Sequence, residues 1–174
     1  MSDKRSIWNC ASKAGLVLGF VCVLYFVLGI LLGKINSTST FALIATSAAS
    51  FLLWLGKFLL CLWLLMFYMK AFANDDPETD RRSVFRFGAL VSLLSALVYS
   101  GCYLAYVSLI NPDFFSETMA PMLQGLPQGT VEAVEEMLPM LPTYTFFANL
   151  IYCWVFGVVL SAIFSRRICP SNPF

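Results

Sequence analysis

The sequence predicts an all-α integral membrane protein with four transmembrane helices, both from its composition and from the length of its apolar runs. Hydrophobic residues make up 59% of the 174 residues and charged residues only 12%, with a mean hydropathy of +0.78. Soluble domains are about 45–50% apolar and about 25% charged. Because a small soluble chain buries only about two-thirds of the surface that it exposes when unfolded, lipid must cover the remaining apolar surface.

Four apolar runs are long enough to cross a bilayer, which takes about 20 mostly apolar residues for a hydrocarbon core of ~30 Å. These runs do not alternate between apolar and polar residues as barrel strands do. Since every backbone group in lipid must be paired within the protein, they are predicted to be helices. The predicted spans are 15–33, 41–69, 87–110 and 144–164, and the whole chain, 1–174, is expected to form one membrane domain.

The first run, 15–33, could instead be a cleaved signal peptide, because Lys4, Arg5 and Lys13 precede it. Its 19 residues are more than the about 7–15 apolar residues of a signal-peptide core. No cleavage site of small residues follows closely. We therefore expect this run to remain as a membrane helix.

The second run contains Lys57, the one charged residue within the four predicted spans. A lysine in the hydrocarbon region costs about 2.5–3.5 kcal/mol on insertion scales, and no span contains an acid that could pair with it. Neutral partners are available on the third and fourth spans, which makes a candidate intramembrane polar site of Lys57, Ser92, Ser95, Tyr99 and Asn149. The alternative, which the sequence favours, is that Lys57 snorkels toward the outer interface.

Small residues recur at four-residue spacing in three of the runs, which allows helix backbones to approach closely in a membrane. The sets are Gly15 and Gly19, Gly29 and Gly33, then Gly88, Ser92, Ala96 and Ser100, and finally Gly157, Ser161 and Ser165. We expect them to pack helices within one monomer, with the third span at the centre. The alternative is a homodimer formed through the first helix.

The segment 111–143, between the third and fourth spans, predicts a short amphipathic helical segment. Its apolar residues repeat at helical spacing among acids, as in Phe114, Phe115 and Met119 and then in Val131 and Val134. Two helices of this kind could lie on the membrane surface. The sequence favours a simpler alternative, in which the segment only connects the ends of two spans.

The distribution of basic residues predicts the orientation of the chain. Nine of them fall on one side of the four spans, and only Lys34 falls on the other. The nine are Lys4, Arg5, Lys13, Lys70, Arg81, Arg82, Arg86, Arg166 and Arg167. Because basic loops stay in the cytoplasm, both termini and the loop between the second and third spans are predicted to be cytoplasmic, with 111–143 outside.

The six cysteines, Cys10, Cys22, Cys61, Cys102, Cys153 and Cys169, are far from one another in the sequence, and no Cys-x-x-Cys pair exists. Four of them fall in apolar runs, so they are interpreted as small apolar residues of membrane helices. The chain has no histidine and no recognisable catalytic motif. We therefore expect no metal and no cofactor, and the net charge of +1 gives no reason to expect a nucleic acid.

Short motifs in three spans resemble those of a known family. The third begins with Arg-Phe-Gly at Arg86 and ends in Ile-Asn-Pro-Asp-Phe from Ile110, the second contains Trp54 and Gly56-Lys57, and the last ends at Arg166-Arg167. Together with the acidic segment before the last span, these resemble domain of unknown function 4199, a four-helix inner-membrane family of Gram-negative bacteria. The resemblance implies a bacterial inner-membrane location. It implies no mechanism, because the family has no established activity.

The sequence favours a non-enzymatic protein that serves as a structural or interaction component of the bacterial envelope. Its expected partners are the lipid bilayer and either a second copy or another membrane protein. The alternative is a small transporter or channel subunit that uses Lys57 and the serine-rich face of the third helix. An enzyme is not expected, since no span contains a charged pair or a nucleophile beside a base. Whether Lys57 faces a cavity or lipid separates the first two hypotheses.

Overall fold

The structure is a computed structural model that describes residues 2–33, 40–75, 80–125 and 127–168. Within these ranges it consists of helices joined by short connections and contains no strand. Four of the helices are long and apolar enough to cross a membrane. The predicted all-α class with four transmembrane helices is therefore confirmed.

The four long helices are α1 (Ser2–Gly33), α2 (Thr40–Asp75), α3 (Arg81–Ala105) and α6 (Leu141–Ile168). A π-helix, η1 (Tyr106–Ile110), continues α3. Each predicted span lies within one of these continuous helical stretches, and the helices run further than the spans. Hydropathy marks only the part of a helix that lies in hydrocarbon, whereas the backbone hydrogen bonds of a helix continue equally well through its polar ends.

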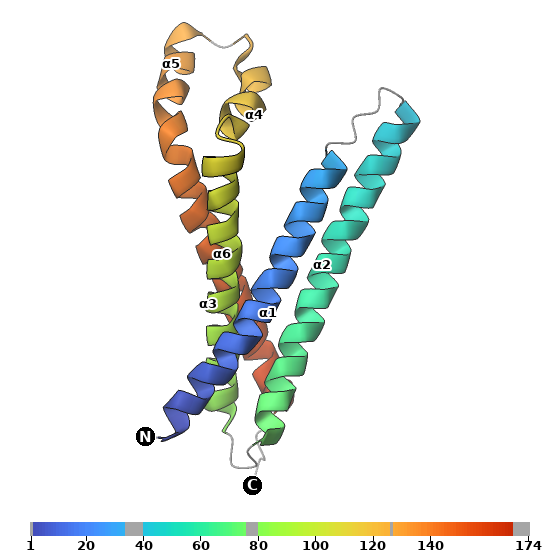
Figure 1. Cartoon of the computed structure of the whole chain (residues 1–174), viewed down its shortest axis with the longest axis vertical. Coiled ribbons are helices and arrows are strands. Elements are labelled where there is room, and N and C mark those ends of the chain that lie inside the picture. Colours follow the sequence, from blue (N-terminus) through green and yellow to red (C-terminus); the bar gives the residue numbers. More distant parts are fainter. Residues whose placement is uncertain (1, 34–39, 76–79, 126, 169–174) are drawn as a thin grey trace.

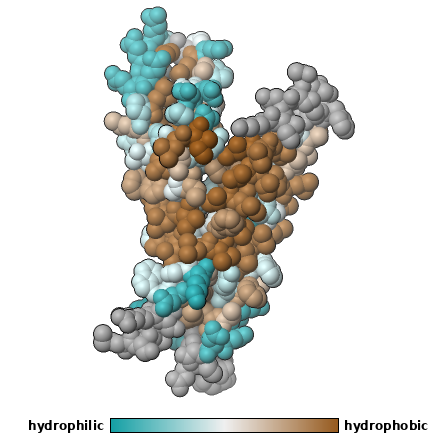
Figure 2. Space-filling model, in the orientation of Figure 1, coloured by the Kyte–Doolittle hydropathy of each residue, from teal (hydrophilic) through white to brown (hydrophobic). Residues whose placement is uncertain are grey.

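The helices form two pairs that meet at one end and diverge at the other. Figure 1 shows α1 beside α2, and α3 beside α6, with the pairs crossing close to the start of α1 and the end of α6. We call this end the base, and the opposite end, where the pairs separate, the open end. Figure 2 shows an apolar band over the middle of the molecule and hydrophilic residues toward both ends. That surface is what a bilayer-spanning protein requires.

The core lies at the base, where all four long helices meet. Phe72 of α2 stacks on Phe87 of α3 with 4.4 Å between the ring centroids. Around this pair, the buried apolar residues come from α1, α2 and α3, namely Ala11, Ala14, Leu18, Leu65, Met69, Val84, Phe87 and Val91. Because this cluster lies at the base, the helices leave room for a cavity further along, between the pairs.

Helix α3 is at the centre of the bundle, as the small residues predict. It packs chiefly against α1 and α6, and Gly88, Ser92, Ala96 and Ser100 are all buried along it. A Cβ atom added at Gly88 would lie 2.5 Å from the Ser161 hydroxyl oxygen of α6, which shows how closely the two backbones approach. The small residues at four-residue spacing on α3 and α6 therefore serve packing within one chain.

The first glycine pair of α1 has the same role against α3. Added Cβ atoms at Gly15 and Gly19 would lie 2.7 Å and 2.8 Å from the Cβ atoms of Leu94 and Val98. Around Gly29, in contrast, an added Cβ would meet no heavy atom of the described residues within 4 Å. The homodimer through the first helix stays a prediction. Gly29 and Gly33 are the glycines of α1 that such a contact could use.

The segment between α3 and α6 contains two short helices, which confirms the predicted amphipathic helical segment. These are α4 (Phe114–Leu123) and α5 (Gln128–Met137), and a 3₁₀ turn, η2 (Leu138–Met140), joins α5 to α6. In Figure 1 the two helices extend beyond α3 and α6 at the open end, roughly along the same axes. This direction agrees with the connector, and a position of α4 and α5 on the membrane surface stays a prediction.

Candidate intramembrane binding site

A cavity of about 420 Å³ lies between the two helix pairs, partway along their length. All four long helices contribute to its wall. Leu18 and Leu65, which belong to the core, form the side nearest the base. The cavity therefore begins where the core ends, at the level at which the helix pairs start to diverge.

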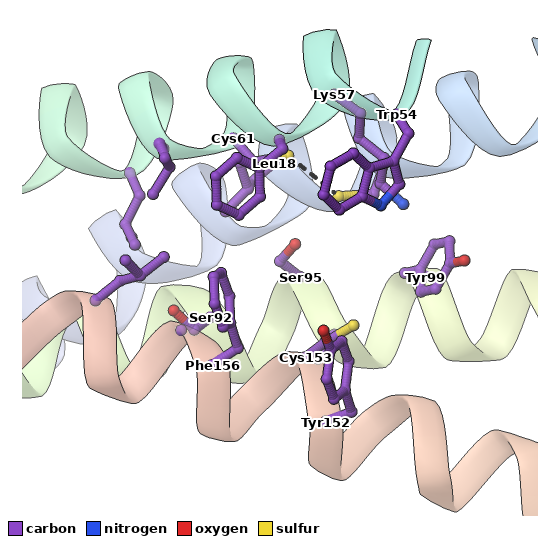
Figure 3. A pocket seen from close by; sticks show the side chains of 17 residues that line it. Leu18, Trp54, Lys57, Cys61, Ser92, Ser95, Tyr99, Tyr152, Cys153 and Phe156 are labelled. Atoms are coloured by element: carbon purple, nitrogen blue, oxygen red, sulfur yellow. Dashed lines mark hydrogen bonds between the residues drawn. The ribbon is translucent and has the colours of Figure 1, made fainter. Parts of the chain in front are cut away.

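Four of the five residues of the predicted polar site line this cavity. Lys57 projects from α2, and Ser92, Ser95 and Tyr99 project from α3 (Figure 3). Asn149 is half-buried on α6 and is not among the lining residues that the structure describes. It lies one helical turn from the lining residue Cys153, toward the open end.

The Lys57 side chain points into the bundle. Its Nζ atom lies 4.4 Å from the centroid of the Tyr99 ring, a geometry in which the ring face attracts the cation. The ammonium group therefore faces the cavity, with a π-face as its neighbour and no acid in any span to neutralise it. Snorkelling toward the outer interface concerns the depth of this group in a bilayer and stays a prediction.

One of the two cavity serines, Ser92, is hydrogen-bonded within its own helix. Ser92 donates to the carbonyl of Gly88 at 2.9 Å, as serines in membrane helices commonly do. Its oxygen can still accept a hydrogen bond from a ligand. Both serines are nearly buried, with 5% and 6% of their surface exposed. The polar part of the cavity is therefore small and lies on α3, across from Lys57.

Three cysteines also line the cavity, which sequence reasoning missed. Cys22 comes from α1, Cys61 from α2 and Cys153 from α6. The Sγ atoms of Cys22 and Cys61 are 3.6 Å apart, and Figure 3 marks this contact with a dashed line. The one signal in the sequence was that Cys61 follows Lys57 by four residues, which places both on one face of α2.

An aromatic rim surrounds the opening of the cavity between α2 and α6. Trp54 of α2 is 59% exposed and Tyr152 of α6 is 72% exposed, and both line the cavity. Behind them, Phe58 and Phe156 contact each other across the two helices, with 5.8 Å between their centroids. Phe51 of α2 and Val155 of α6 are also exposed, so the surface around this rim is apolar.

The fold and the cavity define a multi-pass membrane protein with a candidate site inside its helix bundle. The chain belongs to the family described as "Protein of unknown function (DUF4199)", which matches residues 13–166. The resemblance inferred from the sequence is thereby confirmed. Comparison with curated proteins and with solved structures found no match for this chain.

Proposed function

We propose that this protein binds a lipid-soluble small molecule with an oxygen-bearing head group in the cavity between its helix pairs. The observation that carries this proposal is the Lys57 ammonium, held inside the bundle at 4.4 Å from the Tyr99 ring centroid without an acid in any span. A charged residue at this depth is costly, and such residues commonly mark a functional site. A head-group oxygen would supply the missing hydrogen-bond acceptor.

The size and the lining of the cavity support a ligand of this class. Its volume of about 420 Å³ falls in the range of small-molecule sites, about 300–1,000 Å³. Leu18, Leu62 and Leu65 offer an apolar surface for the body of the ligand. Trp54 and Tyr152 line the cavity and are exposed between α2 and α6, so we propose that the ligand enters between these two helices from the membrane.

This proposal develops the alternative derived from the sequence, a small transporter or channel subunit, because binding from the lipid is the step that a transporter of amphiphiles would need first. A role as an interaction component is the second candidate, and the helices α4 and α5 favour it. Neither contains a buried residue, and Met122 and Met137 are 75% and 55% exposed. A helical segment that extends beyond the bundle and exposes acidic and apolar residues is suited to contact a second protein outside the bilayer.

To test the binding proposal, a photoactivatable palmitate is added to the protein in nanodiscs, and labelled peptides are identified by mass spectrometry. Label is expected on residues of the cavity. A hydrogen bond to a charged group contributes about 1.5–3 kcal/mol, so Lys57→Met should weaken labelling about tenfold or more. Lys70→Met is the matched control, since Lys70 is an exposed residue of the same helix. Equal labelling of both variants would remove the role assigned to Lys57.

We also propose that the protein lies in a bacterial inner membrane with both termini in the cytoplasm. The base of the bundle supports this orientation, because α1 begins there and α6 ends there. The basic residues Arg81, Arg82, Arg86, Arg166 and Arg167 lie in the same end segments of α3 and α6. Basic residues beside a span favour the cytoplasmic side.

Cysteine accessibility in intact cells tests this orientation. Single cysteines are placed at Ser116, in α4, and at Thr79, between the second and third spans, in a chain whose native cysteines are replaced by serine. A membrane-impermeant maleimide is expected to label position 116 in intact cells and position 79 only after the cells are opened. The reverse pattern would show that the orientation is inverted.

A further inference from the structure

Two thiols face each other at the wall of the cavity. Cys22 of α1 and Cys61 of α2 are separated by 39 residues in the chain, yet their Sγ atoms lie 3.6 Å apart. Sulfur atoms in a disulfide are about 2.05 Å apart, so a small approach of the two helices would allow the bond to form. Both cysteines are free thiols and partly exposed to the cavity.

A metal ion does not explain this pair. The described residues contain no group of three or more metal-binding side chains of the kind that would hold one. Lys57 lies on the same face of α2 as Cys61, and its positive charge would oppose a cation in the same cavity. The same charge favours a negatively charged or electron-rich ligand, and it stabilises a thiolate, which is the reactive form of cysteine.

A reagent that dissolves in the membrane could reach these thiols between α2 and α6, where Trp54 and Tyr152 line the cavity and are exposed. Aromatic side chains form part of the wall, and Phe58 and Phe156 contact each other beside the opening. Such surfaces stack on flat rings. A ligand with a flat ring, a ring oxygen to accept from Lys57, and the capacity to take two electrons fits all three features.

We infer that Cys22 and Cys61 form a redox-active dithiol that reduces a lipid-soluble quinone bound in the cavity. This inference rests on the proposed function, because it identifies the chemical class of the ligand. In the step, two S–H bonds break and one S–S bond forms between the cysteines. The two electrons and two protons pass to the quinone, whose two carbonyl groups become the two hydroxyl groups of the quinol. Cysteine disulfide and quinol are the products, and no other reactant is needed.

Lys57 has a defined part in this step. As negative charge develops on a quinone oxygen, the ammonium donates a hydrogen bond to it and stabilises that charge. Lys57 and Cys61 are four residues apart on α2, so the amine and the thiol reach the cavity from one face of one helix. Cys153 also lines the cavity, but the step does not use it, because no second pair of thiols in contact is seen among the described residues.

The test uses the reduced full-length protein in nanodiscs with decylubiquinone as the probe. Quinol is followed by its ultraviolet absorbance, free thiols are counted with a mass-tagged maleimide, and the disulfide is located by peptide mass spectrometry. We expect one quinol for each Cys22–Cys61 disulfide. Cys22→Ser and Cys61→Ala should each abolish both products. Cys102→Ser, an exposed position on α3, should leave them unchanged.

Two further measurements keep the outcome clear. Melting curves establish that each variant is folded, and Lys57→Met, which retains both thiols, should slow quinol formation. Absence of quinol from the folded parent protein, or quinol formation by the Cys22 and Cys61 variants at the level of the parent protein, would overturn the inference. If palmitate labels the cavity but the quinone stays oxidised, the redox inference fails and the binding proposal stands. If quinol forms as expected, the prediction of a non-enzymatic protein is wrong.

Discussion

Replacing Gly157 with leucine is expected to prevent α6 from packing against α3. A Cβ atom at this position would overlap the Cβ and Oγ atoms of Ser92 and would lie 3.6 Å from its Cα atom. Because the obstructing Cβ is bonded directly to the backbone of α3, no side-chain rotation can relieve the overlap. One helix must move away, and this would loosen all the close contacts between the small residues of α3 and those of α6.

The expected loss of stability is large for one substitution. Overpacking typically costs about 1–3 kcal/mol and occasionally more, and this site is in the most extensive helix contact of the described structure. Thermal melting in detergent, followed by circular dichroism, measures the effect. Gly101→Leu is the matched control, since an added Cβ at Gly101 on α3 meets no heavy atom of the described residues within 4 Å.

The control should melt at or above the temperature of the parent protein. Leucine is a better helix former than glycine by nearly 1 kcal/mol, and at Gly101 no clash opposes that gain. At Gly157 the same gain is present but is outweighed by the clash. Similar melting temperatures for the two variants would mean that α3 and α6 separate at little cost, and the close packing would then have to be abandoned.

The fold could be predicted from this sequence because membrane helices depend on properties of single segments. Length and hydropathy identify a span without any knowledge of its neighbours. The small residues Gly88 and Gly157 also mark the faces at which helices approach, and α3 is central as they indicate. The amphipathic pattern in 111–143 identified helices for the same reason, since 3.6-residue periodicity is local.

The site could be predicted only in part, because its contacts depend on which helix faces which. The serines and Tyr99 share one face of α3, so they could be grouped from spacing alone. Periodicity does not say that Tyr99 is opposite Lys57, and so the contact of the ammonium with this ring could not be predicted. The contact of Cys22 with Cys61 joins residues 39 apart, and no spacing rule predicts contacts between separate helices.

Replacing Lys57 with methionine is expected to stabilise the protein while removing its ligand. The lysine costs about 2.5–3.5 kcal/mol in hydrocarbon on insertion scales, and its contact with the Tyr99 ring returns about 0.5–2 kcal/mol. Methionine has a similar length and shape and no charge. Since the contact of Lys57 is with the face of a ring, its loss leaves no hydrogen-bonding group without a partner.

The net gain should be about 0.5–3 kcal/mol, the difference between the cost of the charge and the cation–π contact. For a chain of this size, 1 kcal/mol shifts the melting temperature by about 2–4 °C, so an increase of several degrees is expected in matched detergent. Lys70→Met, at an exposed position of α2, should melt like the parent protein.

Residues retained at a cost to stability are typical of functional sites. A gain in stability together with a loss of palmitate labelling would identify Lys57 as one of these residues. A clear fall in the melting temperature of the Lys57→Met protein would instead mean that the ammonium holds the helices together, and Lys57 would then be a structural residue.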